Sequence, residues 1–261
     1  MIIDGRAMAS EVLARTKTRA QKLARRPNVL VYVAPRETPA TRSYLKSKAR
    51  SAGEAGCDFE ETQSLSFSSH ANAIVVQLPL PQEINTVEIL NSIPLEQDAD
   101  VLSNAAREKF EQGDTDALLP PVVGAIKEVF EKNSVAIKGK KAIVVGAGFL
   151  VGAPVSVWLT QQGAKVEIIT LELGDLSTLA TADIIVSGAG SPHLITPDML
   201  KAGVVLVDAG TSELNGTVVG DADPACAPMC SLFTPVPGGI GPLAVAKLFE
   251  NVVTLAERVV K

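Results

Sequence analysis

Tyr44 and Lys48 lie four residues apart in the segment TRSYLKSKARSAGEAG, whose apolar spacing predicts a helix. This spacing places a phenol and an amine on one helix face. A hydroxyl beside a lysine orients the amine, and burial lowers the amine's pKa because it disfavours the charged form. A neutral amine acts as a general base near pH 7. An ordinary exposed Tyr/Lys face is the alternative interpretation.

A second signal is the glycine-rich stretch VVGAGFLVGAP, which places Gly146, Gly148 and Gly152 between an apolar strand and a helix. Glycine permits a tight turn and close approach of a pyrophosphate, and a helix N-terminus supplies N–H groups and positive dipole for it. The spacing GxGxxxG is one residue longer than the commonest dinucleotide fingerprint. A glycine-rich turn without a ligand is the alternative interpretation.

The choice of dinucleotide depends on Glu172, which follows Gly152 by 20 residues (172 − 152). An acidic side chain at this distance accepts hydrogen bonds from the adenosine ribose hydroxyls. A carboxylate there repels a 2′-phosphate, so the residue favours NAD over NADP. A surface glutamate just past a strand end is the alternative.

The elements that must position these residues alternate along the chain. Helical spacing covers residues 7–24, 40–55, 83–93, 122–133 and 151–163, and a long helix follows the loop TPVPGGIGP. Short branched apolar runs predict strands within residues 28–34, 73–81, 140–148, 164–170, 182–190 and 203–210, with a short helix at 196–201. Residues 95–116 are polar and predict a boundary loop with a short helix. The alternation predicts an α/β fold with parallel sheets covered by helices.

Composition limits the class of protein. The 261 residues are 46% hydrophobic and carry a formal net charge of −5, which disfavours a broad nucleic-acid surface. Three cysteines without a CxxC motif indicate a reducing compartment. The sequence shows no signal peptide and no apolar run of membrane-spanning length. We expect a soluble cytoplasmic protein with no membrane or nucleic-acid partner.

Three more segments follow the Tyr/Lys pair in a fixed order. Gln77 ends the strand AIVVQLPLP, Asp98 and Asp100 lie in the loop SIPLEQDADV, and TPVPGGIGP precedes the last helix. Together with GAGFLVGAP and the opening IIDGRAMA, they resemble the methylenetetrahydrofolate dehydrogenase/methenyltetrahydrofolate cyclohydrolase family over nearly the whole chain. The isolated residues His70 and His193 have no Ser or Cys partner at a recognisable spacing, which disfavours a hydrolase triad.

The resemblance implies a two-domain enzyme of one-carbon metabolism. It would oxidise 5,10-methylenetetrahydrofolate to the methenyl form with NAD or NADP and hydrolyse that product to 10-formyltetrahydrofolate. A three-layer α/β domain, residues 1–118, would bind folate and be completed by the C-terminal helix 242–261. A Rossmann-like domain, residues 119–241, would bind NAD(P) across a cleft. Members of the family are usually homodimers, so we expect one here.

The resemblance also implies roles for individual residues. Lys48 would be the central catalytic group, Gln77 would tune it, Tyr44 would line the folate site and Asp100 would hold the pterin ring. The expected sites are catalytic Lys48, Tyr44 and Gln77; substrate-binding Tyr44, Asp100, Pro237, Gly238 and Gly239; cofactor-binding Gly146, Ala147, Gly148, Val151, Gly152, Leu171, Glu172, Thr211 and Gly241; and no metal ligands. Asp98 is a second folate contact or, alternatively, a turn or cap residue.

The chain departs from the family pattern in ways that concern the cofactor. The family often reads Gly-Arg-Ser or Gly-Ala-Ser at the dinucleotide turn, where this chain has Gly146-Ala147-Gly148, and Leu171-Glu172 replaces a segment that usually carries a basic residue. Both changes weaken binding of a 2′-phosphate and favour NAD.

Other departures concern the folate domain. The family's KDVDG is here QDADV, with Gln97 for lysine and Val101 for glycine, so we expect the loop around Asp100 to differ. A threonine is lost in LPPVVG, and the stretch between Cys57 and Ala73 is short and predicts no helix. A variant with one activity, a non-catalytic dinucleotide sensor and a dehydrogenase of amino or hydroxy acids are the alternative hypotheses.

Overall fold

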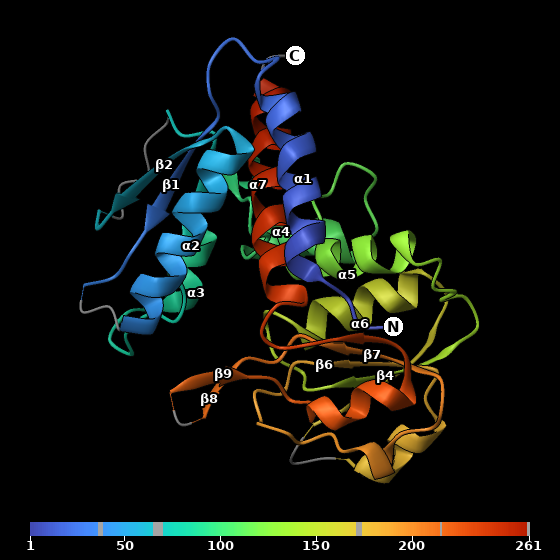
Figure 1. The fold of residues 1–261 in the computed structure, drawn as a ribbon. Helices are drawn as coiled ribbons and strands as arrows, with labels where there is room; N and C mark the ends of the chain where they lie inside the picture. Colours follow the sequence, from blue (N-terminus) through green and yellow to red (C-terminus); the bar gives the residue numbers. More distant parts are fainter. Residues whose placement is uncertain (36–38, 65–69, 171–173, 215, 260–261) are drawn as a thin grey trace. The chain divides into compact units, whose positions relative to one another are not determined.

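The fold is seen in a computed structural model that describes residues 1–35, 39–64, 70–170, 174–214 and 216–259 (Figure 1). The chain divides into two compact units. The three-stranded unit comprises Ala9–Pro121 and Val245–Lys261, and the five-stranded unit comprises Met1–Met8 and Val122–Ala244. Within the described residues, every helix is too short or too polar to cross a bilayer.

The sheet of the three-stranded unit is parallel, in the order β2 (Asp58–Thr62), β1 (Asn28–Tyr32), β3 (Ala73–Val76). The branched runs NVLVY and AIVV form the two strands whose side chains are mostly buried, as expected for a covered parallel sheet. α2 (Pro39–Ala55) packs beside β2 and ends at Gly56, whose φ of +77° suits glycine. α3 (Thr86–Asn91), η1 (Leu95–Gln97) and α4 (Asn104–Glu111) complete the unit.

Two helices from opposite ends of the chain meet in this unit. α1 (Gly5–Ala20) and α7 (Ile240–Val259) run side by side there (Figure 1). Arg19 holds Glu257 with two hydrogen bonds of 3.1 and 2.7 Å, and Arg15 pairs with Glu250 at 3.2 Å. The predicted return of the C-terminal helix to the first domain is therefore confirmed.

The five-stranded unit is a parallel sheet in the order β10 (Cys230–Thr234), β7 (Val204–Asp208), β6 (Ile184–Ser187), β4 (Lys141–Val145), β5 (Lys165–Ile169). The chain proceeds from β4 to β5 in one direction and from β6 to β7 in the other, so the order reverses between β4 and β6. Ligands of open α/β sheets bind at the carboxyl ends of the strands beside such a switch point. α5 (Pro121–Lys132) and α6 (Gly152–Gln161) follow the predicted pattern, and α6 packs against β4 and β5.

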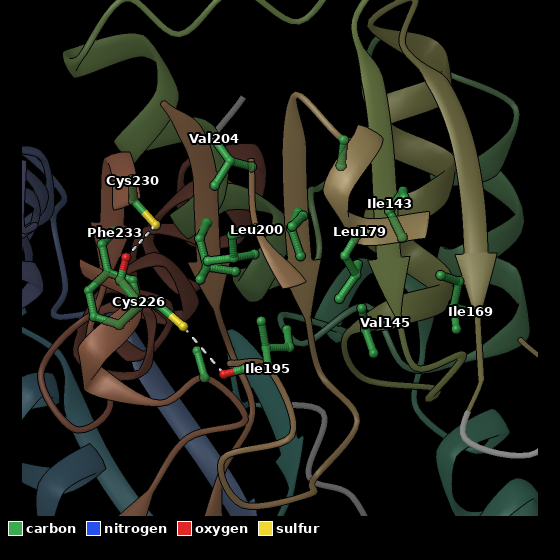
Figure 2. Close-up of a cluster of buried hydrophobic side chains, with 14 residues drawn as sticks. Ile143, Val145, Ile169, Leu179, Ile195, Leu200, Val204, Cys226, Cys230 and Phe233 are labelled. Atoms are coloured by element: carbon green, nitrogen blue, oxygen red, sulfur yellow. Dashed lines mark hydrogen bonds between the residues drawn. The ribbon is translucent and has the colours of Figure 1, made fainter. Parts of the chain in front are cut away.

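The core of this unit includes two of the three cysteines (Figure 2). The Cys226 thiol donates to the Ile195 carbonyl at 3.3 Å, and the Cys230 thiol donates to the Cys226 carbonyl at 3.2 Å. Burial raises the pKa of Cys226 to about 12 and that of Cys230 to about 11. Both residues therefore act as packing residues. Trp158 on α6 is also buried and lies against Phe130, with ring centroids 6.0 Å apart.

Several elements differ from the sequence prediction. β2 was not predicted because its segment DFEET is mostly exposed and lacks apolar alternation. The short antiparallel hairpin of β8 (Ser212–Leu214) and β9 (Thr217–Val219) and the strand β10 were also missed. The 3₁₀ helices η2 (Leu176–Thr181), η3 (Pro197–Met199) and η4 (Pro224–Met229) are short, and only η3 was predicted.

The first residues of the chain also differ in their assignment. Residues 1–8 were predicted to belong to the first domain, but Met1–Met8 group with the five-stranded unit. The Ile3 N–H donates to the Phe233 carbonyl at 2.9 Å, and the Phe233 N–H donates to the Met1 carbonyl at 2.8 Å. These backbone bonds attach the N-terminus to β10.

Candidate functional site

α2 and β3 bring the predicted lysine and glutamine together. Lys48 Nζ donates to Gln77 Oε1 at 3.0 Å, and the two residues are 6% and 7% exposed. The Gln77 side-chain amide donates to the Leu78 carbonyl at 2.7 Å, which turns its oxygen toward the amine. Gln77 directly follows β3, so the pair lies at the carboxyl end of a strand, where α/β proteins bind ligands.

The surroundings of Lys48 favour its neutral form. Burial lowers the pKa of Lys48, and the Asp100 carboxylate opposes this shift in part. Lys48 Nζ lies 5.1 Å from the centre of the Tyr44 ring, so the predicted pair lies together. Desolvation, with a contribution from Asp100, raises the pKa of Tyr44 to about 12, although 46% of the residue's surface is exposed. The phenol therefore stays protonated and remains a hydrogen-bond donor.

The loop that carries Asp100 is fixed by its neighbour Asp98. The Asp98 carboxylate is 1% exposed and accepts hydrogen bonds from the N–H groups of Leu102 and Ser103, the latter at 2.8 Å. Of the two interpretations of Asp98, a second folate contact and a turn or cap residue, these hydrogen bonds support the turn residue. Burial raises the pKa of Asp100, whereas the nearby Lys48 lowers it. Among the predicted residues, Tyr44, Lys48, Gln77 and Asp100 form one electrostatic cluster.

The two substitutions in this loop differ in their local fit. Val101 has a φ of +57°, a left-handed conformation that suits a glycine and strains a β-branched residue, and its side chain is 2% exposed. The Gln97 amide donates to the Ala71 carbonyl.

Sequence reasoning missed Asn251 on α7. Its amide donates to the carbonyls of Ala99 and Leu119, both at 2.9 Å, and so fastens the residue before Asp100. An amide between apolar residues in FENVV was the available signal.

The glycine turn after β4 fits a pyrophosphate. Gly146 has a φ of +95°, and a Cβ on Gly152 would lie 1.9 Å from the Gly146 carbonyl oxygen, so both positions require glycine. A Cβ on Gly148 would meet nothing nearer than 3.9 Å, which leaves open space over that backbone. α6 then begins after Val151, whose apolar side chain caps none of its first N–H groups. The Ala153 N–H donates to the Gly148 carbonyl at 3.1 Å, and Pro154 carries no N–H, so the positive dipole end of the helix is what faces this turn. Ala147 lies in the same turn.

Most of the remaining predicted residues of the five-stranded unit lie in loops. Pro237 follows a cis peptide bond, and Gly238 has a φ of +108°. A Cβ on Gly5 would lie 1.8 Å from the Gly239 carbonyl oxygen, so the start of α1 packs directly on this loop. Two further predicted positions complete the set: Gly241 in the first turn of α7 and the exposed Thr211 after β7. Leu171 and Glu172 lie outside the described residues.

A buried carboxylate at the end of β7 was also missed. Asp208 is 1% exposed and accepts hydrogen bonds from the N–H groups of Gly210 and Ala222 at 2.9 and 2.8 Å. Burial, opposed by these bonds and assisted by the nearby Asp221, raises the pKa of Asp208 to about 6. Runs such as VVLVDAG predict a strand, but they do not reveal that the terminal aspartate is buried.

This carboxylate makes stability depend on pH. Because its folded pKa lies above the ordinary value of 3.8, the stabilisation is complete below about pH 4 and is lost as the pH rises through about 6. The free energy of unfolding of the unsubstituted protein, relative to Asp208→Asn, should fall by about 3 kcal/mol across this window. Urea unfolding at pH 4.5 and 7.5 measures about 2 kcal/mol of this change, because Asp208 is already mostly ionised in the unfolded chain at pH 4.5. Asp223→Asn, at a less buried aspartate that caps η4, is the control, and a pH-independent difference would contradict the expectation.

Known proteins match this arrangement. Residues 120–260 match the family model for the tetrahydrofolate dehydrogenase/cyclohydrolase, NAD(P)-binding domain. The bifunctional protein FolD of Hydrogenobaculum sp. is 33% identical over 96% of both chains.

Solved structures match the whole chain as well. FolD methylenetetrahydrofolate dehydrogenase/cyclohydrolase of Campylobacter jejuni superposes with a TM-score of 0.94 at 30% identity and covers 99% of both chains. The Trypanosoma brucei enzyme, solved with NADP cofactor and inhibitor, has a TM-score of 0.93 at 28% identity, covering 100% of this chain and 98% of its own. These matches show that the chain belongs to the tetrahydrofolate dehydrogenase/cyclohydrolase family.

Proposed function

We propose that the protein oxidises 5,10-methylenetetrahydrofolate to 5,10-methenyltetrahydrofolate with NAD(P) and hydrolyses that product to 10-formyltetrahydrofolate. The observation that carries this proposal is the buried Lys48–Gln77 pair, whose Nζ and Oε1 atoms are 3.0 Å apart. The pair occurs in a chain that belongs to the tetrahydrofolate dehydrogenase/cyclohydrolase family. The three-stranded unit would bind folate and the five-stranded unit the dinucleotide. By analogy with the family, the active form is a cytoplasmic homodimer.

The glycine turn supports the dehydrogenase half. Gly148 would let the pyrophosphate approach the backbone, and the positive dipole end of α6 would offset its charge. NAD(P) bound there supplies the hydride acceptor for the methylene carbon.

Lys48 supports the cyclohydrolase half. Its neutral amine takes a proton from water while the water oxygen bonds to the methenyl carbon. The bond from that carbon to N5 then breaks as the lysine returns its proton to N5. The hydroxyl of the adduct loses its remaining proton to solvent as its oxygen becomes the carbonyl, which leaves the formyl group on N10. An ammonium would repel the cationic substrate, so the lowered pKa of Lys48 serves this step. Gln77 Oε1 holds the amine in place.

Asp100 supports folate recognition. A carboxylate accepts two N–H bonds from a planar aminopyrimidine, the geometry that the pterin ring offers. The Asp98 turn and the Asn251 amide fix the backbone on either side of it. Tyr44 supplies an aromatic face and a hydroxyl beside the reacting amine.

An absorbance assay of methenyltetrahydrofolate tests the proposal. With methylenetetrahydrofolate and oxidised cofactor, the methenyl absorbance should rise as the reduced nicotinamide forms. With methenyltetrahydrofolate alone, the absorbance should decay faster than in buffer. If only one of these absorbance changes is observed, the protein has only that activity. If neither is observed, the proposal is refuted.

We also propose that NAD is preferred to NADP. The support is Glu172, together with an alanine and a glycine at positions 147 and 148, where no side chain binds a 2′-phosphate. The kcat/KM for NAD should exceed that for NADP about 10-fold or more, because a carboxylate at Glu172 repels the 2′-phosphate of NADP. Glu172→Gln should lower the ratio of kcat/KM for NAD to that for NADP. Glu167→Gln is the control, because Glu167 is an exposed glutamate of β5. A preference for NADP in the unsubstituted protein would contradict the proposal.

A further inference from the structure

Asp221 is a fully buried carboxylate that the proposed chemistry does not use. Its exposed fraction is 0%, and each of its oxygens is occupied. Oδ2 accepts from the Ser187 hydroxyl at 2.6 Å and the Ala189 N–H at 2.7 Å, while Oδ1 accepts from the Ser191 N–H at 2.8 Å. All three donors belong to the end of β6 and the loop that follows it. Asp221 is therefore the acceptor around which this loop is built.

The loop that Asp221 holds packs directly on the glycine turn. A Cβ on Gly146 would lie 2.8 Å from the Gly188 carbonyl oxygen and 3.0 Å from the Ala189 backbone nitrogen. A Cβ on Gly188 would lie 2.4 Å from a methyl carbon of Val151. These distances leave no room for a side chain between the loop and the turn, so a shift of residues 188–189 would displace the turn. The turn's shape thus depends on a loop whose N–H groups end on Asp221.

A second carboxylate fixes Asp221 itself. Asp208 accepts from the N–H of Ala222, the residue after Asp221, at 2.8 Å and from that of Gly210 at 2.9 Å. Gly210 also packs on Asp221, because a Cβ there would lie 2.2 Å from the Asp221 carboxyl carbon. The two aspartates therefore connect the ends of β6 and β7, next to the point where the strand order reverses.

We propose that Asp221 is a positioning residue for the dinucleotide: it sets the 188–191 loop, and through it the glycine turn, in the shape that binds the pyrophosphate. The proposal rests on the proposed function, since it concerns the same cofactor. Asp221 contacts the loop and does not need to contact the ligand.

The chemistry requires a carboxylate and not merely a side chain of this size. An ionised carboxylate only accepts hydrogen bonds, and Asp221 faces three donors, two of them backbone N–H groups that cannot turn away. In Asp221→Asn, one side-chain position becomes an NH₂ group. Whichever way the amide turns, it opposes the N–H of Ala189 or that of Ser191. One loop N–H therefore loses its acceptor, and the loop shifts against Gly146.

The experiment compares Asp221→Asn with Asp223→Asn in the full-length protein. Asp223 lies two residues away and caps η4 by accepting from the Ala225 N–H, a bond that an asparagine oxygen can also accept, so the control makes the same substitution without taking the acceptor from a loop N–H. The dissociation constant for the reduced dinucleotide is measured by its fluorescence, and ring opening by the decay of methenyl absorbance. Ring opening is not a redox step and reports on the Lys48 site alone.

We expect Asp221→Asn to raise the dissociation constant and to lower the dehydrogenase kcat/KM for the cofactor at least 10-fold, with ring opening within twofold of the unsubstituted rate. Asp223→Asn should change the dissociation constant, the dehydrogenase kcat/KM and the ring-opening rate by no more than twofold each. An unchanged dissociation constant in folded Asp221→Asn, or a parallel fall in ring opening, would overturn the inference.

Ser187→Ala decides the question if Asp221→Asn does not fold. It removes only the hydroxyl that donates at 2.6 Å, so it should raise the dissociation constant two- to fivefold and leave ring opening intact. No change in binding would overturn the inference. A failure of the proposed function is recognised separately, because the unsubstituted protein would then lack the folate reactions even where it binds the dinucleotide.

Discussion

Lys48→Met is expected to reduce ring opening of methenyltetrahydrofolate about 1000-fold or more, to near the uncatalysed rate. General-base catalysis contributes about 10²- to 10⁴-fold, and methionine fills the same narrow space without a basic atom. Hydride transfer should survive in part, because no proton leaves the methylene carbon in that step. The measurement is the decay of methenyl absorbance, corrected for hydrolysis in buffer.

The same lysine should set the pH dependence of ring opening. Its folded pKa lies below the ordinary value of 10.5, so the neutral fraction grows as the pH rises through the lowered pKa and then levels off. The enzymatic rate should follow this curve, and Lys48→Met should show none of it.

Lys46→Met is the matched control, since Lys46 lies on the same helix but is exposed. It should keep both the rate and the pH curve. Full ring-opening activity in Lys48→Met would remove Lys48 from the mechanism. Thermal unfolding separates loss of catalysis from loss of folding, and we expect Lys48→Met to be at least as stable as the unsubstituted protein, because it removes a buried amine that pays a desolvation penalty.

Gly152→Ala is expected to weaken dinucleotide binding about 100-fold, because the added methyl group would lie 1.9 Å from the Gly146 carbonyl oxygen. The atom that the methyl group meets belongs to the backbone and cannot rotate away as the end of a flexible side chain can, so the turn must open. Overpacking of this kind costs about 1–3 kcal/mol. Ring opening at Lys48 should continue. The measurements are cofactor affinity and the two activities at a temperature below the melting point.

Two other glycines make this prediction specific. Gly53→Ala, on the exposed side of α2 with nothing within 4 Å, should alter neither reaction. Gly148→Ala has room in the protein itself, so a loss of affinity there without a loss of stability would locate the pyrophosphate over that residue. Unchanged cofactor affinity in Gly152→Ala would show that the turn does not bind the dinucleotide.

The predictable part of this protein is local. Branched apolar runs gave five of the buried parallel strands, and 3.6-residue spacing gave the helices that carry Tyr44, Lys48 and the glycine turn. The glycines at 146 and 152 were recognisable because a tight turn before a helix requires them whatever lies elsewhere. Family resemblance then linked Lys48 with Gln77, which the structure brings to 3.0 Å.

The unpredictable part depends on distant partners. β2 and β10 are strands because a neighbouring strand offers hydrogen bonds, and their own side chains carry little sign of it. Asp221 and Asn251 look like ordinary polar residues until the fold surrounds them with N–H groups or carbonyls from more than 25 residues away.

The sequence alone therefore determined which chemical groups are present and on which helix, strand or turn each one stands, because those features follow from short-range periodicity and backbone sterics. Tertiary structure decided the pKa values of these groups and the exact geometry in which they are held. Lys48 has a lowered pKa because the fold removes water from it, and the glycine turn keeps its shape because a loop anchored on Asp221 packs against it. Burial and long-range hydrogen bonding exist only once the chain has folded.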